Sequence, residues 1–351
     1  MIGSTSQDPG FSAQDARIEP AAVTQHYLRA AALAFFSRNR GFVSSLIFFI
    51  LMLIVFIFTT DGVFLHAAAY TAVFVSLPIF VILTVSMVFV VVAGEIDLAF
   101  PSTVGMCAYV FSYTFNNGLN PFAALVLSVL AGLAIGLVNG ILVTVIKLSS
   151  LVATLGMQFL LLGILNVLCN GNGIPLTSLS STGFYTLFVG TIGTFPVQMF
   201  WGIGFAALAL YLFNLHRFGA RICCVGDNPQ AAANMGIDAR RVKMAAFMFV
   251  GFASALAGVL AVLIDTSFYP TTGQGYLLTV LAAVFIGGTP TWGGVGTIAG
   301  AICGACTVAF IETGLIAAGL SGFWTNLFYG LVVVLSLVLH RFNRPAGARA
   351  V

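Results

Sequence analysis

The sequence predicts an all-α protein that crosses a membrane about ten times. Hydrophobic residues make up 60% of the 351 residues, charged residues only 7%, and the mean hydropathy is +1.08. Soluble domains carry roughly 25% charged residues, so a chain this poor in charge cannot cover a water-facing surface. The apolar residues also fall into runs that are long enough to span a bilayer as helices, and the basic residues lie on alternate connections only.

A polar N-terminal tail, residues 1–40, comes first. It contains no apolar stretch followed by a small-residue cleavage site, so we expect no cleaved signal peptide. Arg38 and Arg40 directly precede the first apolar run, 42–60, which places the N-terminus in the cytoplasm. A transmembrane domain of residues 41–341 and a cytoplasmic C-terminal tail of residues 342–351 complete the predicted organisation.

Nine further spans follow the first, each an apolar run bounded by polar or glycine-rich residues. Their expected ranges are 67–93, 98–116, 121–146, 150–169, 196–215, 244–264, 276–287, 294–316 and 321–340. The eighth of the ten spans, 276–287, is short for a bilayer core, so a re-entrant or broken segment is an alternative there. Ten spans place both termini on the same side of the membrane.

The positions of the basic residues support this topology. All 13 Lys and Arg residues lie in the N-terminal tail, at Lys147, in the loop 217–243 or near the C-terminus. Each of these places falls on the side expected to be cytoplasmic, as the positive-inside rule requires for an even number of spans. The net charge of +3 is small and indicates no nucleic-acid partner.

The loop 217–243 predicts a short helix that is exposed to water. Asp227, Asn228 and Pro229 form a helix-start signal, because an Asx side chain accepts from free backbone N–H groups and proline has none to lose. Gly236 is a helix-stop signal, since a left-handed residue closes the last turn. The predicted helix therefore runs from Pro229 to Met235, about two turns.

Two glycine-rich interruptions break the apolar pattern, at 94–102 and at 287–297. Each follows a similar run of residues, which begins Leu-Thr-Val at Leu83 in the first case and at Leu278 in the second. This similarity indicates an internal repeat, and transport folds built from repeats often carry broken helices near the pathway.

Few polar side chains lie within the spans. Glu95 and Asp97 either line a substrate path or cap the third helix, where negative charge suits the helix dipole. Glu312 either lines the path or packs against a polar partner between helices. Glycines at four-residue spacing, Gly132 with Gly136 and Gly300 with Gly304, suit close helix packing.

The sequence predicts no catalytic and no metal site. The four histidines lie at span edges without a partner at metal-ligand spacing. A phosphate-binding Walker A loop needs Gly-Lys-Ser/Thr, but Lys147 is followed by Leu and Lys243 by Met. The chain is therefore not expected to be an enzyme, and energy from ATP would have to come from a partner.

Three patches resemble the permease subunits of bacterial ABC importers for simple sugars, the ribose-type family allied to branched-chain amino acid permeases. They are Gly94 to Leu98, Phe218 to Ile237, and Gly287 to Thr297. The resemblance covers about residues 45–340. This sequence departs from the family pattern at Glu95, where the family has glycine, and at Ala99, where it has serine.

The resemblance implies a multi-pass permease of the bacterial inner membrane that imports a small polar solute. A second permease subunit would complete a homo- or heterodimer, separate ATPase subunits would hold the ATP and magnesium, and a periplasmic binding protein would deliver the solute. The chain itself would hold no cofactor, and its other contacts would be with membrane lipid.

The resemblance also assigns roles to the motifs. The short cytoplasmic helix would couple the permease to the ATPase, through Asp227, Asn228, Pro229, Gln230, Ala231, Ala232, Asn234 and Gly236. Arg240, Arg241 and Lys243 would contact the ATPase or the lipid surface. Candidates for the translocation path or its hinges are Gly94, Glu95, Asp97, Gly287, Gly288, Gly293, Gly294 and Glu312.

The expected solute is a monosaccharide or polyol. Within the same class, a branched-chain amino acid, a nucleoside or a signal sugar is the alternative. In a different class, a secondary transporter would use the intramembrane carboxylates to carry protons.

Overall fold

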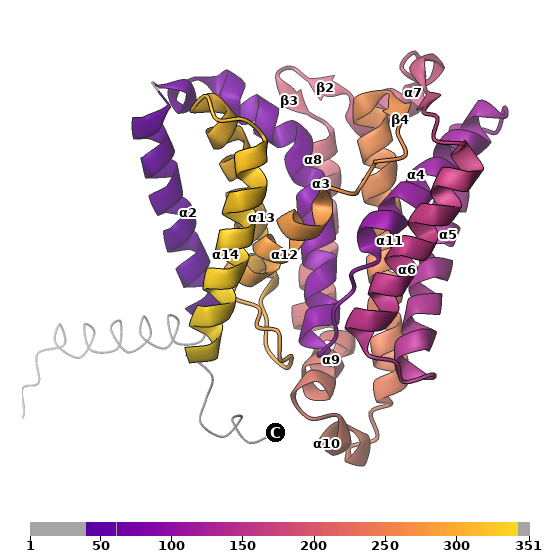
Figure 1. Ribbon diagram of the computed structural model, residues 1–351, viewed down its shortest axis with the longest axis vertical. Helices are drawn as coiled ribbons and strands as arrows, with labels where there is room; N and C mark the ends of the chain where they lie inside the picture. Colours follow the sequence, from indigo (N-terminus) through magenta and orange to yellow (C-terminus); the bar gives the residue numbers. More distant parts are fainter. Residues whose placement is uncertain (1–39, 61, 343–351) are drawn as a thin grey trace, which may run out of the picture. The chain divides into compact units, whose positions relative to one another are not determined.

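The computed structural model describes residues 40–60 and 62–342 (Figure 1). The chain divides into Met1–Arg40 and Gly41–Val351, and the description that follows concerns the second unit. The N-terminal tail up to residue 39 and the residues after 342 lie outside the described part. The predicted domain boundaries stay predictions.

One helix lies at each of the ten expected spans. They are α2 (Arg40–Thr59), α3 (Ala67–Val92), α4 (Phe100–Asn116), α5 (Pro121–Thr144), α6 (Ser150–Cys169), α8 (Gln198–Leu210), α11 (Ala239–Asp265), α12 (Tyr276–Ile286), α13 (Ile298–Ala317) and α14 (Phe323–Phe342). A π-helical turn, η3 (Tyr211–Leu215), continues α8. Among the described residues, seven helical spans are both long and apolar enough to cross a membrane, while α12 and the described part of α14 are shorter apolar segments.

The eighth expected span, 276–287, corresponds to α12, which is a short helix, as the alternative of a broken segment predicted. α12 has 11 residues, which is about 16 Å of helix and half the thickness of a bilayer core. A non-helical stretch precedes it and another follows it. α4 is similar, because its 17 helical residues are preceded by the non-helical stretch 93–99.

Short elements connect the spans on both sides. On one side lie η1 (Val63–Leu65), η2 (Thr177–Leu179), α7 (Gly183–Val189) and four two-residue strands, β1 (Ile174–Pro175), β2 (Thr191–Ile192), β3 (Phe195–Pro196) and β4 (Ser267–Phe268). β1 pairs antiparallel with β4, and β2 with β3. On the other side lie α9 (Arg217–Asp227) and α10 (Pro229–Asn234), at the lower end of Figure 1, where α2 begins and α14 ends. Among the described residues, Lys147 and the basic residues of the loop 217–243 lie at this end, which is therefore the cytoplasmic end.

α3 and α11 form the centre of the fold. Leu77 to Val92 of α3 are buried without interruption, and α11 is buried almost continuously from Ala253 to Leu263. A helix that is apolar all round belongs inside, so neither helix needs an amphipathic pattern. The outer helices instead expose large apolar side chains, as lipid contact requires.

Two four-helix runs repeat one packing pattern in opposite directions. α3 packs against α11, α12 and α13, while α11 packs against α3, α4 and α5. α3 runs towards the cytoplasmic end and α11 runs away from it (Figure 1). The internal repeat therefore matches α3 with α11, not the end of α3 with the end of α12 as the sequence comparison did. The two ends that the sequence comparison aligned share a left-handed glycine directly after the helix, Gly94 or Gly288.

The glycines at four-residue spacing do bring helices into close contact, as predicted. A Cβ on Gly132 of α5 would overlap the carbonyl oxygen of Gly251 of α11, and a Cβ on Gly136 would lie 2.8 Å from the Cα of Met248. Gly300 and Gly304 of α13 approach the backbone of Gly287 and Ala283 in the same way. Only a missing side chain allows two helix backbones to approach this closely.

Gly132→Leu is expected to destabilise the protein by about 1–3 kcal/mol or more, because the added atoms would have to push α5 away from α11. The midpoint of thermal unfolding in detergent measures the effect. Gly156→Leu is the matched control, since a Cβ at that helical glycine meets nothing within 4 Å. Equal midpoints for the two variants would contradict the close packing of α5 on α11.

Candidate coupling and translocation site

The cytoplasmic loop between η3 and α11 forms two helices. The sequence predicted only the second, α10, and missed α9 before it. α9 is amphipathic, with Gly219, Ile222 and Val225 buried on one face. The three-residue spacing of these small and apolar residues is the signal that could have revealed the helix.

The hydrogen bonds at both ends of α10 confirm the predicted capping. The side chain of Asn228 accepts hydrogen bonds from the backbone N–H groups of Gln230 and Ala231, both at 3.0 Å. At the other end Gly236 has a φ of 78°, the N–H of Gly236 donates to the carbonyl of Ala233, and that of Ile237 donates to the carbonyl of Ala232. These two bonds form a Schellman motif, so a helix of only six residues has both ends closed.

Beside the end of α9, three glycine-containing segments pack so closely that their backbones are in contact. A Cβ on Gly226 would overlap the carbonyl oxygen of Val92 at the end of α3, and a Cβ on Gly293 would lie 2.9 Å from the Cα of Gly94. The N–H of Gly294 donates to the carbonyl of Val92 at 2.8 Å. We call Gly94, Gly226, Gly293 and Gly294 the glycine junction. It joins the cytoplasmic loop that contains α9 and α10 to both glycine-rich interruptions of the membrane domain.

The glycine junction also depends on backbone conformation. Gly94, Gly293 and Gly294 have φ values of 82°, 83° and 77°, which side chains with a Cβ rarely adopt. At these three positions glycine is therefore required by conformation, whereas Gly226 is required by space.

Glu95 follows the junction and makes an ion pair with Lys243 of α11. The Nζ–Oε1 distance is 2.6 Å, and the two side chains are 16% and 19% exposed, respectively. The sequence treated Glu95 as a path or capping residue and Lys243 as a contact for a partner or lipid, so it did not anticipate this pair. The pair connects the first break to α11, the helix that begins directly after the cytoplasmic loop.

Asp97 lies in the same break and is buried, with 2% of its surface exposed. Its Oδ1 accepts a hydrogen bond from the N–H of Ala99 at 2.8 Å, just before α4 begins. This bond closes a turn before the helix and is not an N-cap, because the N-cap of α4 is Ala99 and no side chain caps that end. Asn139 of α5 lies beside the carboxylate.

Two side chains of α6 hold the broken segment in place. The N–H of Ile96 donates to the hydroxyl of Ser150 at 3.3 Å, and the N–H of Leu98 donates to that of Thr154 at 2.9 Å. Both hydroxyl residues are buried. Sequence analysis did not find them, because a lone Ser or Thr in a helix carries no sign of a partner more than fifty residues away.

The glycines of the second interruption, 287–297, lie in two different places. Gly293 and Gly294 belong to the glycine junction, but Gly287 and Gly288 do not. A Cβ on Gly287 would lie 2.8 Å from the Cα of Ala301, and one on Gly288 would lie 2.6 Å from the Cα of Gly41. The first pair of glycines therefore serves the packing of α12 against α13 and α2.

Glu312 lies apart from the other two carboxylates. It is half-buried on α13, with Tyr276 of α12 and Tyr329 of α14 near its carboxylate. Tyr329 donates its hydroxyl to the carbonyl of Val308 at 3.1 Å. The described residues contain no group of three or more His, Cys, Asp or Glu side chains that could hold a metal ion.

These features define an all-α, multi-pass membrane protein of the transporter class, with two broken helices and a capped cytoplasmic loop. The chain belongs to the family described as the branched-chain amino acid transport system / permease component, whose model matches residues 69–337. It is a permease subunit of the ABC-importer type in the bacterial inner membrane, a transport component without ATPase activity of its own. The resemblance drawn from the three patches is thereby confirmed.

Named relatives are similar over most of the chain. The autoinducer 2 import system permease protein LsrC of Salmonella typhi is 32% identical over 312 residues, which are 87% of this chain and 87% of that protein. The protein of the same name from Yersinia pseudotuberculosis serotype O:3 is 31% identical over 312 residues, which are 87% of this chain and 86% of that protein. No solved structure matches significantly.

Glu95→Gln is expected to destabilise the protein by about 1–3 kcal/mol, because it leaves the Lys243 ammonium largely buried without its counter-charge. Lys243→Met should do the same, and the double variant should lose less than the sum of the two. Thermal unfolding of the four proteins gives this coupling energy. Additive losses would show that the ion pair does not stabilise the fold.

Proposed function

We propose that this chain is the membrane-spanning subunit of an ATP-driven importer for a small hydroxylated solute. It receives the solute from a periplasmic binding protein and works with a second permease chain, identical or homologous. A separate ATPase drives it through α9 and α10. The observation that carries the proposal is the glycine junction, because it connects the cytoplasmic loop that forms α9 and α10 directly to both breaks in the membrane domain.

A displacement of α10 would reach the membrane domain by two routes. α9 ends in the glycine junction, where backbone contacts leave no compressible side chain between the segments. α11 begins three residues after Gly236 and carries Lys243, which holds Glu95. Both routes end on the segment 93–99, so closure of an ATPase at α10 would move the break before α4.

The outer face of α10 offers a docking surface. Ala232 points inward and is fully buried, whereas Gln230, Ala231 and Asn234 are exposed. Met235 at the C-terminal end is 65% exposed, whereas the apolar side chains Ile222 and Val225 of the same loop are buried. A groove on the ATPase would cover it, and Arg240 nearby would pair with acidic groups of the same partner.

The internal contacts of Glu95 and Asp97 favour an uncharged solute at the first break. Glu95 is neutralised by Lys243, and Asp97 is engaged by the backbone before α4. Neither offers a free counter-charge to the ammonium group of an amino acid. The relatives are named for import of autoinducer 2, so a signal sugar of this kind is the proposed solute.

The direct test is uptake by proteoliposomes that contain the complete complex, with its ATPase and binding protein. We expect ATP-dependent uptake of labelled autoinducer 2, no uptake of labelled leucine, and no effect when the proton gradient is dissipated. Uptake that needs the proton gradient but not ATP would overturn the proposal. Uptake of leucine alone would overturn the assigned solute.

Met235→Asp is expected to reduce ATP-driven uptake at least about tenfold by placing a charge in the docking contact, while the unfolding midpoint of the permease stays unchanged. Co-purification of the ATPase with the permease measures docking directly. Ser181→Asp is the matched control, because Ser181 is exposed at the opposite end of the fold. Normal uptake and normal co-purification for Met235→Asp would exclude α10 as the docking element.

A further inference from the structure

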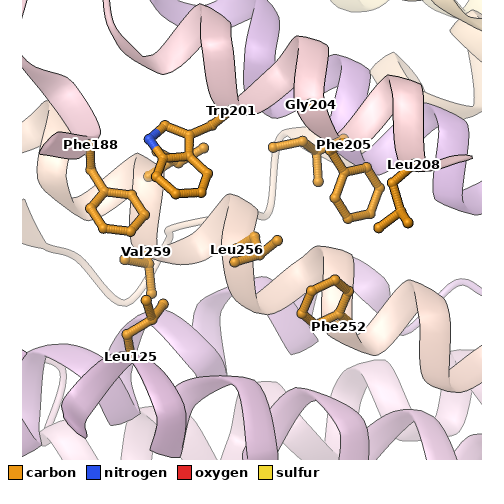
Figure 2. Close-up of a pocket in the computed structure, with 11 residues that line it drawn as sticks. Leu125, Phe188, Trp201, Gly204, Phe205, Leu208, Phe252, Leu256 and Val259 are labelled. Atoms are coloured by element: carbon orange, nitrogen blue, oxygen red, sulfur yellow. The ribbon is translucent and has the colours of Figure 1, made fainter. Parts of the chain in front are cut away.

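A groove runs along α11 on the side where α5 and α8 flank it. Its inner part is a cavity of about 230 Å³ lined by apolar residues (Figure 2). Trp201, Gly204 and Leu208 of α8 form one wall, and Phe252, Leu256 and Val259 of α11 form the other. The cavity lining includes no charged side chain.

The groove continues to the cytoplasmic end of the fold. Phe252 lines both parts, and the cytoplasmic part is also lined by Leu212, Phe249, Arg221 and Arg241. From Arg241 to Val259 the groove follows 18 residues of one helix, which is about 27 Å. A bilayer core is roughly 30 Å thick, so a lipid of one leaflet, which spans about half of it, covers the groove from Arg241 to about Phe252. We call this feature the α8–α11 groove.

We propose that the α8–α11 groove binds one anionic phospholipid of the cytoplasmic leaflet. Its phosphate lies between Arg221 and Arg241, at the level where the headgroups of that leaflet are found. One acyl chain follows Phe249 and Phe252 and enters the cavity from its cytoplasmic end, past Leu208 towards Gly204. A basic site at the cytoplasmic end of an apolar cleft between transmembrane helices has the chemistry that recognises an anionic headgroup.

The charges favour a lipid over a second copy of this chain. α5 and α8 contain no Asp or Glu, so a copy packed on this face would bring no acidic group to Arg221. Asp238 is already paired with the Nε of Arg241, 3.1 Å from its Oδ2, so it would not meet an arginine of a second copy, whereas the terminal nitrogens of Arg241 can still donate to a phosphate. Two such faces in contact would place arginines against arginines.

Gly204 allows the cavity to be filled without disturbing the fold. It lines the cavity, and a Cβ added there meets no atom within 4 Å. Gly204→Leu would therefore occupy the space proposed for the acyl chain. Gly163→Leu on α6 is the matched control, since a Cβ there also meets nothing within 4 Å and Gly163 does not line the groove.

The experiment is native mass spectrometry of the purified full-length chain, titrated with phosphatidylglycerol or phosphatidylcholine of identical acyl chains. We expect one phosphatidylglycerol to bind in preference to phosphatidylcholine. Arg221→Gln and Arg241→Gln should each weaken its binding about fivefold, and Arg240→Gln, next to the groove but not lining it, should not. Gly204→Leu should weaken it at least tenfold, and Gly163→Leu should leave it unchanged.

Three outcomes would overturn the proposal. Equal binding of the two lipids would show that Arg221 and Arg241 do not select the headgroup. An equal loss in Arg240→Gln would indicate diffuse attraction to the basic loop. A change from dimer to monomer in Gly204→Leu, with lipid binding intact, would assign the groove to a second copy of the chain.

Discussion

Backbone contact at the glycine junction is the constraint on which the rest of the structure depends. The end of α3, the end of α9 and the segment before α13 approach until their main chains touch, which leaves no room for a Cβ at Gly226 or Gly293. A contact between backbones is stiff, because no side-chain rotamer can absorb a displacement. The cytoplasmic loop and the membrane domain are therefore mechanically continuous at this point.

The charged groups around the junction extend that continuity. Lys243 and Glu95 connect the first turns of α11 to the break before α4, and Ser150 and Thr154 fix the same break to α6. Most of the polar groups near the break thus bind one another, not a ligand. This arrangement fits a permease that opens and closes around a solute selected by a separate binding protein.

On the lipid-facing side, the helices are not in contact along their whole length. α8 leaves space beside α11, and this space is apolar within the membrane but ends at Arg221 and Arg241. The outer face of the same cytoplasmic region, with Met235 exposed, is available to a protein partner. The loop between η3 and α11 therefore borders both the proposed lipid site and the proposed docking surface.

The sequence by itself determined the fold class, the ten spans, the side of each loop and the capped helix at Pro229. These depend on composition, run length and residues within one or two turns of each other, and such local physics can be read along a chain. Only the tertiary structure decided that Gly94, Gly226 and Gly293 meet, that Glu95 pairs with Lys243 and that α3 matches α11 in the repeat. These contacts join residues far apart in sequence, and their partners are set by how the helices pack, which no local pattern encodes.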